Sequence, residues 1–385
     1  MSELGAAALL SRHATRAGAP ASVVFQVTDR CNYDCVHCYE THGAKPELSF
    51  PEIDRILAEL ADLGVLFITF TGGEFFMRRD ADEILRAARR RRFAVKLLTT
   101  GHFIDDARAD LIAGLGAMQV GLSCYGGEAD VHEKVTNVKG SWKRTLDAAR
   151  RLIARGVRVF LKTPIMALNV HSLVQLKQIG EAMGAEVQFD PKVTAREDGE
   201  LAPLGLRTDD ETLRRYYGSH ELGILDELCR TFDEAEAHAS LEERPCIAGV
   251  ETFGINPQGM VSACHTIPIA AGDLKRQSLR EIWETSPELA RVRGLTWGRI
   301  DECNRCEVRA YCQRCHAMAY LEDGRLDGPS TEACRHAVIL RDLLRAQGLV
   351  PTPAEGQDSL PPPLVRRRPD GRPLKIRPSA LRIIA

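Results

Sequence analysis

The sequence predicts an α/β protein, with a parallel sheet and helical crossovers followed by a small cysteine-rich α+β domain. Three observations support this fold class. Short apolar or β-branched runs alternate with segments of helical periodicity through the first half of the 385-residue chain, the pattern of strands joined by crossover helices. The alternation then stops. Most of the twelve cysteines fall in short spacings towards the two ends of the chain, which indicates metal ligands.

The first strand is expected at residues 22–28, a β-branched run that ends just before the first cysteines. The next helix begins at a capping box, Ser49-Phe50-Pro51-Glu52, and ends at Gly64. Residues 65–70 form the second strand, which runs directly into Thr71-Gly72-Gly73-Glu74. Polar and glycine residues therefore follow two successive strands at their carboxyl ends.

Four further units continue the alternation. Helices are expected at residues 82–91, 105–115, 141–155 and 172–183, and strands at 94–99, 118–123, 157–163 and 186–189. Six such units predict either an open doubly wound sheet or a partial barrel, with right-handed crossovers. In both folds, ligands bind at the carboxyl ends of the strands.

Five segments follow from these patterns: an N-terminal extension (1–21), the sheet domain (22–205), a charged helical bridge (206–240), a cysteine-rich domain (241–350) and a tail (351–385). The cysteine-rich domain contains a β-hairpin over residues 253–262 and a short helix over 279–283. The tail is rich in Pro and Arg, a composition typical of disorder.

Composition excludes several classes of partner. The formal net charge of −2 and the pI near 6.6 give no reason to expect nucleic acid or an acidic membrane. Neither a secretory signal nor an apolar run of the ~18 residues that a membrane span needs is visible. Because the cysteines are grouped in short spacings and do not form a disulfide framework, we expect a reducing cytoplasm.

Cys31, Cys35 and Cys38 form a C-x3-C-x2-C loop after the first strand. Three thiolates can hold three irons of a four-iron, four-sulfur cluster and leave the fourth iron open for a ligand. A zinc site with His37 as the fourth ligand is the alternative. Gly72-Gly73-Glu74 would put bare backbone and a carboxylate beside this loop, which could hold a cationic amine, or would simply form a tight turn.

The cysteine loop together with Gly72-Gly73-Glu74 resembles the motifs of the radical S-adenosylmethionine (SAM) enzymes. The resemblance implies a partial (β/α)6 TIM-like barrel and a SAM-binding 4Fe-4S cluster on the three cysteines. It implies further that Gly72, Gly73 and Glu74 contact the methionyl amine of SAM, that His37 lies near adenine, and that Ser123 touches the ribose or carboxylate. Lys162, Asn169 and Arg196 are further polar groups at strand ends, with ordinary structural roles as the alternative.

The C-terminal cysteines resemble the SPASM extension of radical SAM maturases. Cys246 and Cys264 flank the predicted hairpin, and a C-x2-C-x5-C-x2-C group precedes a single Cys334; the last step is x2 where the family usually has x3. The resemblance implies two auxiliary 4Fe-4S clusters, the first open or completed by Cys229, and a pair of zinc ribbons is the alternative. The implied ligands are Cys246, Cys264 and Cys315 for the first cluster, and Cys303, Cys306, Cys312 and Cys334 for the second.

The function that the resemblance implies is a peptide maturase. It would cleave SAM reductively to a 5'-deoxyadenosyl radical and modify a ribosomally made precursor peptide by crosslinking, thioether formation, epimerisation or oxidation. A separate leader-peptide-binding protein and a flavodoxin- or ferredoxin-type electron donor would be partners. The sulfatase-maturing branch is disfavoured because His265 stands where an acidic residue is expected. Tetrapyrrole side-chain processing and a non-catalytic metal scaffold remain the alternatives, and no catalytic acid or base is identified.

Overall fold

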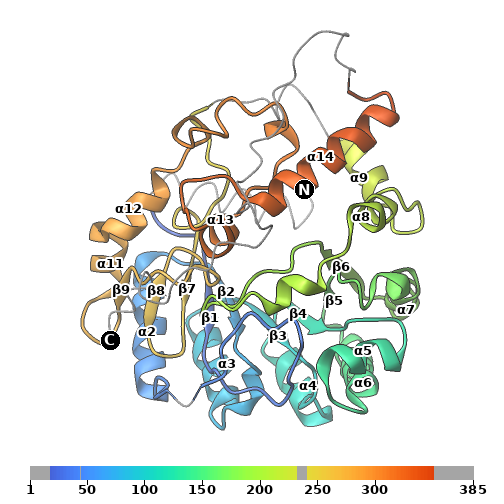
Figure 1. Ribbon diagram of the computed structural model, residues 1–385. Coiled ribbons are helices and arrows are strands. Elements are labelled where there is room, and N and C mark those ends of the chain that lie inside the picture. The colour runs from blue at the N-terminus through green and yellow to red at the C-terminus, as the bar shows by residue number, and fades with distance from the viewer. Residues whose placement is uncertain (1–17, 44, 232–240, 351–385) are drawn as a thin grey trace. The chain divides into compact units, whose positions relative to one another are not determined.

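The structure, a computed structural model, describes residues 18–43, 45–231 and 241–350 (Figure 1). The extension before residue 18, the end of the predicted bridge at 232–240 and the predicted tail lie outside the described residues. The described chain forms two compact units. The first contains residues 18–164, Gln175–Pro191 and Ile247–Arg293, and the second contains Ile165–Val174 and the described parts of residues 192–246 and 294–350.

The first unit is built on one nine-stranded sheet in the order β6-β5-β4-β3-β2-β1-β7-β8-β9. Its first six strands are parallel and neighbour one another in sequence order. A doubly wound sheet would reverse its strand order at a switch point, so this sequential order confirms the partial barrel. The six strands are β1 (Ser22–Gln26), β2 (Phe67–Thr71), β3 (Ala94–Thr99), β4 (Gln119–Ser123), β5 (Val159–Pro164) and β6 (Glu186–Asp190).

The predicted hairpin joins this same sheet. Strand β7 (Thr252–Ile255) pairs in parallel with β1, and β8 (Met260–Ser262) and β9 (Gly272–Asp273) follow in antiparallel order. The hairpin therefore belongs to the first compact unit.

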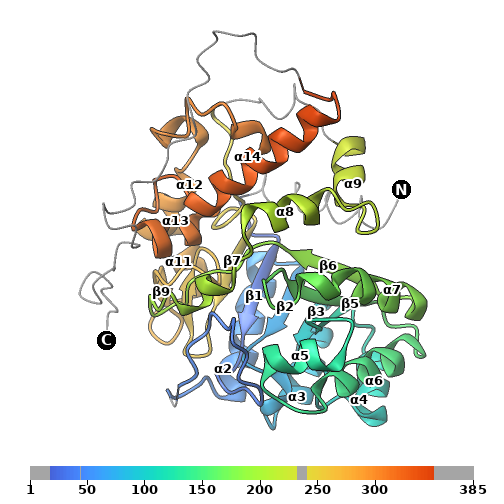
Figure 2. The same ribbon diagram turned by 45° about the vertical axis from the view of Figure 1, so that its right-hand side comes forward.

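Helices cover the outer face of the strands (Figure 2). The helices of this unit are α2 (Phe50–Leu63), α3 (Ala81–Arg90), α4 (Asp106–Gly114), α5 (Ala129–Thr136), α6 (Ser141–Ile153) and α7 (Leu173–Met183), with α11 (Leu279–Thr285) and α12 (Pro287–Arg293) after the hairpin. The predicted capping box starts α2, because the carboxylate of Glu52 accepts hydrogen bonds from the backbone N–H and the hydroxyl of Ser49, both at 2.7 Å. Gly64 ends the helix with a φ of 91°. Helix α5 was not predicted.

The two faces of the sheet differ in chemistry. Phe25, Phe70 and Leu161 point to the helices and are fully buried. The opposite, inner face carries Lys96 and, paired in register, Ser123 and Lys162. Side chains alternate across a strand, so the apolar core lies under the helices and the polar inner face is left for a ligand.

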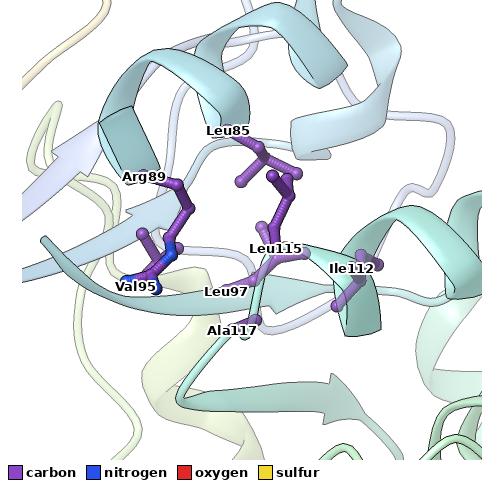
Figure 3. A pocket seen from close by; sticks show the side chains of 7 residues that line it. All are labelled: Leu85, Arg89, Val95, Leu97, Ile112, Leu115 and Ala117. Carbon is purple, nitrogen blue, oxygen red and sulfur yellow. The ribbon is translucent and has the colours of Figure 1, made fainter. Parts of the chain in front are cut away.

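One small pocket lies on the helix-covered face, between α3, β3 and α4 (Figure 3). It has room for about one water molecule. Its lining is apolar apart from Arg89, and the other lining residues are Leu85, Val95, Leu97, Ile112, Leu115 and Ala117. The pocket is a packing gap in the core, on the other face of the sheet from the polar side chains.

The second unit is helical in its described part. Helix α14 packs against α8 and against the short turn η5. Its helices are α8 (Asp210–Tyr217), α9 (Ile224–Thr231), α13 (His316–Asp323) and α14 (Thr331–Ala346), with the 3-10 turns η2 (Val170–Ser172), η3 (Ala202–Leu206), η4 (Trp297–Arg299) and η5 (Arg309–Tyr311).

No helix in the described ranges is both long and apolar enough to cross a bilayer.

Candidate cluster and cofactor site

The loop with Cys31, Cys35 and Cys38 leaves the carboxyl end of β1 and is anchored by α5. The N–H of Asp34 donates to the carbonyl of Thr136 at 3.3 Å, and the N–H of Val36 donates to the carbonyl of Val135 at 3.0 Å. The side-chain amide of Asn137 also donates to the carbonyl of Asp34, at 2.8 Å. The C-terminal end of α5 thus fixes the middle of the cysteine loop.

The Gly72-Gly73-Glu74 segment braces the start of the same loop through its backbone. The N–H of Gly73 donates to the carbonyl of Thr28 at 2.9 Å, and that of Glu74 donates to the carbonyl of Arg30 at 2.8 Å. A Cβ on Gly72 would lie 2.7 Å from the Thr28 carbonyl oxygen, and a Cβ on Gly73 would lie 2.5 Å from that of Arg30. Both contacts are too short for a side chain, so glycine is required at both positions.

The carboxylate of Glu74 is buried and holds the end of β3. It accepts hydrogen bonds from the Thr99 hydroxyl at 2.7 Å, the Thr100 N–H at 2.7 Å and the Phe76 N–H at 3.1 Å. Glu74 is 1% exposed. Its two oxygens therefore accept hydrogen bonds from the ends of neighbouring elements, and its backbone carbonyl accepts one from the Met77 N–H at 3.0 Å.

We expect Glu74→Gln to destabilise the first unit by about 1–3 kcal/mol, because the amide places a donor where the protein already supplies donors. Urea denaturation of the metal-free protein measures this change. Glu128→Gln, an exposed residue before α5, is the matched control. Equal denaturation midpoints for the two variants would contradict this role of Glu74.

His37 lies in a short aromatic row that the sequence did not reveal. Its ring meets that of Tyr125 edge-on, with centroids 4.7 Å apart, and Tyr125 stacks on His132 at 5.3 Å. Burial, and then the charge of Lys162, lowers the pKa of His37 to about 4. The imidazole is therefore neutral at pH 7, and its buried Nδ1 has no hydrogen-bond partner within the described part of the chain.

The sequence position of Tyr125 gave a weak indication that it belongs to the site. It stands two residues after Ser123, just past the end of β4. Its backbone N–H donates to Nδ1 of His132 at 3.1 Å, and so the row is anchored on α5. The predicted His37 ring in the cysteine loop needs a side chain to pack against. Residues just after the ends of neighbouring strands, such as Tyr125, are the candidates.

The donor set of the loop fits an iron-sulfur cluster. Burial raises the pKa of Cys31 to about 11 and that of Cys35 to about 12, so these thiols need a metal to become thiolates. Asn32, between them, has a buried side-chain amide with no partner in the described residues. In the same residues, no three His, Cys, Asp or Glu side chains converge as one metal ion would require; cluster cysteines instead bind separate irons.

The hairpin brings Cys264 and His265 over the inner face of the sheet. A Cβ on Gly254 of β7 would lie 2.7 Å from the His265 nitrogen, so the chain crosses directly above this strand. The ring of Tyr39, next to Cys38, lies edge-on to His265 at 6.1 Å. Burial would raise the pKa of Cys264, but the hydrogen bond and charge of His265 lower it to about 7.

Four cysteines of the second unit lie near one another. Cys303 and Cys312 pack on Trp297 and Ile300. Burial, together with the charges of Cys303 and Cys306, raises the pKa of Cys334 to about 12; Cys334 itself lies in the first turn of α14. The structure therefore brings together Cys303, Cys306, Cys312 and Cys334, the set expected for the second auxiliary cluster.

The remaining predicted residues are divided between the units. Cys246 and Cys315 belong to the second unit and Cys264 to the first, and the side chain of Cys229, on α9, lies outside the described residues. Asn169 accepts a hydrogen bond from the Met166 N–H at 2.8 Å, and Arg196 pairs with Asp198 at 3.1 Å. Both contacts are local, since each joins residues two or three positions apart in the sequence.

Comparison with known proteins gives two family matches. Residues 25–182 match the Radical SAM superfamily, and residues 246–316 match the SPASM family, described as an iron-sulfur cluster-binding domain. Among relatives, the PqqA peptide cyclase of Granulibacter bethesdensis is 26% identical over 86% of this chain and 91% of its own. The AdoMet-dependent heme synthase of Methanosarcina barkeri is 22% identical over 80% and 94%.

Solved structures share the fold. Streptococcus suis SuiB bound to its precursor peptide SuiA has a TM-score of 0.62 at 15% identity, covering 84% of this chain and 78% of SuiB. Native anSMEcpe with bound AdoMet has a TM-score of 0.66 at 14% identity, covering 85% and 98%. The partial barrel with a cysteine loop at its strand ends is that of a radical SAM enzyme. The chain therefore contains a Radical SAM domain over residues 25–182 and a SPASM domain over residues 246–316.

Proposed function

We propose that this enzyme uses SAM and iron-sulfur clusters to modify a ribosomally made peptide. The observation that carries the proposal is the cysteine loop braced by Gly72 and Gly73 at the strand ends, in a chain that also groups four cysteines in its second unit. Relatives named PqqA peptide cyclase and the fold shared with SuiB support a peptide as substrate.

The predicted site residues of the first unit have the following roles. Cys31, Cys35 and Cys38 hold the SAM-binding cluster, and backbone carbonyls of the Gly72-Gly73 segment accept from the methionyl amine. Glu74 keeps that segment in place, neutral His37 packs against adenine, and Ser123 contacts the ribose or carboxylate. When bound, the reduced cluster and SAM supply a 5'-deoxyadenosyl radical that abstracts hydrogen; the protein orients the reactants and excludes water.

The second auxiliary cluster is fully ligated, by Cys303, Cys306, Cys312 and Cys334. The first is held by Cys246, Cys264 and Cys315, and its fourth position is open or completed by Cys229. Clusters held there would supply an acceptor for the electron left after bond formation, or would position the peptide. Electrons reach the SAM-binding cluster from a flavodoxin or ferredoxin, and a separate small protein binds the leader of the precursor peptide. The grouped thiols, which are typical of a reducing compartment, support a location in the cytoplasm.

Replacing Cys312 with Ser should separate SAM cleavage from product formation. We expect uncoupled 5'-deoxyadenosine formation to persist while peptide modification is lost, because the auxiliary centre acts after hydrogen abstraction. Chromatography of both products from one anaerobic reaction gives the ratio. Equal losses of the two activities would instead assign Cys312 to folding.

The proposed function is tested by metal analysis and SAM turnover together. Protein reconstituted without oxygen should contain about twelve irons, which correspond to three four-iron clusters, and should form 5'-deoxyadenosine when reduced with dithionite. Zinc in place of iron, with no 5'-deoxyadenosine formed, would support a non-catalytic scaffold and refute the proposal.

Tetrapyrrole side-chain processing is a second candidate, favoured by the relative named AdoMet-dependent heme synthase. Porphyrin and precursor peptide should be offered to the same enzyme in parallel. The tetrapyrrole function would be favoured over the peptide function by two results together. Added porphyrin would change in absorbance and protect the enzyme, and peptides encoded near the gene would not react.

A further inference from the structure

Arg314 is a buried cation in the middle of the C-terminal cysteines. It lies between Cys312 and Cys315 in the sequence and is only 2% exposed. Taking a guanidinium out of water is costly unless the charge is paired. A buried arginine in this place therefore needs a partner of opposite charge.

The protein groups that contact Arg314 are all neutral. Its Nε donates to the carbonyl of Gly328 at 2.9 Å, and its Nη2 donates to that of Leu326 at 2.7 Å. Its Nη1 contacts Nδ1 of His316, which must be the acceptor because a guanidinium has only donors. No carboxylate among the residues that the structure describes lies within ion-pair distance. These contacts fix the orientation of the guanidinium but leave its charge uncompensated.

The counter-charges that act most strongly on Arg314 are those of the cysteines, and the charge of the Asp323 carboxylate also acts on it. Burial lowers the pKa of Arg314, whereas the charges of Cys303, Cys312, Cys315 and Cys246 raise it. This set includes ligands expected for both auxiliary clusters. Neutral thiols carry no charge that could pair with the guanidinium. Thiolates that bind a cluster are negatively charged and neutralise it.

We propose that Arg314 is a positioning residue of the auxiliary centre, whose buried guanidinium is the counter-ion of the thiolate-ligated clusters and raises their reduction potential. This inference rests on the proposed function, which assigns these cysteines to clusters. Cluster potentials depend on net charge and on nearby hydrogen bonds. Because reduction adds one negative charge, a fixed cation next to the ligands favours the reduced state and makes the cluster a better electron acceptor.

The test is an EPR-monitored redox titration of the full chain, in a background where Cys31, Cys35 and Cys38 are all alanine so that the SAM-binding cluster gives no signal. Arg314→Gln should shift the one-electron equilibrium about ten-fold towards the oxidised cluster, about 59 mV to more negative potential. Arg325→Gln is the matched control, because it removes the same charge from a side chain that is 51% exposed and paired with Glu302. We expect that control to leave the potential unchanged.

Iron content separates the outcomes. Unchanged potentials in Arg314→Gln, with full iron, would overturn the proposal. If Arg314→Gln loads less iron, Arg314→Lys, which keeps the charge, should restore both iron and potential; equal failure of the lysine variant would assign Arg314 to packing and also overturn the proposal. Absence of iron in the background protein itself would instead refute the proposed function.

Discussion

Replacing Cys31, Cys35 and Cys38 together with alanine is expected to abolish SAM cleavage while the C-terminal cysteines keep their iron. The three thiols share one loop, held by α5 and by the Gly72-Gly73 segment. The loop contains no further cysteine, and four-iron clusters are normally held by cysteine thiolates. Iron analysis and chromatography of 5'-deoxyadenosine measure the two quantities on the same sample, and we expect about two thirds of the iron to remain, since two of three clusters are untouched.

Cys124→Ala is the matched control for this triple variant. Cys124 is fully buried after β4, and its thiol donates to the carbonyl of Gly126 at 3.8 Å. Its replacement costs some stability but should leave SAM cleavage and iron content unchanged. Continued SAM cleavage in the triple variant would refute the assignment of the cysteine loop.

Gly73→Ala is expected to reduce SAM cleavage by about a hundred-fold, the cost of moving reacting groups by roughly an ångström. The added Cβ would lie 2.5 Å from the Arg30 carbonyl oxygen and 2.9 Å from the Cβ of Cys31. Backbone atoms at such distances cannot yield as a flexible side chain can, so the cysteine loop must move. Turnover of SAM by the reconstituted variant, with its iron content, measures the effect.

The control is Gly114→Ala at the end of α4, where a new Cβ meets no atom within 4 Å. Alanine favours helix over glycine by about 1 kcal/mol, so this variant should be as active as the parent and no less stable. Full activity in Gly73→Ala would show that the close approach of the two segments is dispensable.

Local patterns in the sequence were sufficient for the six parallel strands and most of their helices. The capping box at Ser49 and the glycine at position 64 gave both ends of α2. Buried apolar residues at helical spacing, such as Ile53, Ile56 and Leu60, gave its inner face. Such signals are contained within a few residues of one another, which is why they can be read without a structure.

Features that depend on contacts distant in sequence could not be predicted in this way. The pairing of β7 with β1 joins Phe253 to Val23, and no local pattern indicates which edge of the sheet a hairpin will join. Helix α5 has eight residues and an N-cap, Glu128, without a side-chain capping bond. Its role as the anchor of the cysteine loop is visible only from the hydrogen bonds of Val135 and Thr136.

In the candidate site, too, local sequence motifs could be predicted and contacts between distant residues could not. The spacing of Cys31, Cys35 and Cys38 and the motif at Gly72 were evident from the sequence. The internal partners of the Glu74 carboxylate were not, because Thr99 and Thr100 belong to the next strand and its loop. Arg314 appeared only as a residue between two cysteines. Its burial required the structure, as did the finding that no carboxylate of the described residues lies within ion-pair distance of it.

The central claim is that the enzyme abstracts hydrogen from a peptide by radical SAM chemistry. The most direct test is an anaerobic reaction of the reconstituted enzyme with SAM and uniformly deuterated peptides encoded beside its gene. We predict that 5'-deoxyadenosine gains deuterium in proportion to the peptide that is modified, as measured by mass spectrometry of both products. Unlabelled 5'-deoxyadenosine together with an unchanged peptide mass and an unchanged peptide stereochemistry would contradict the account.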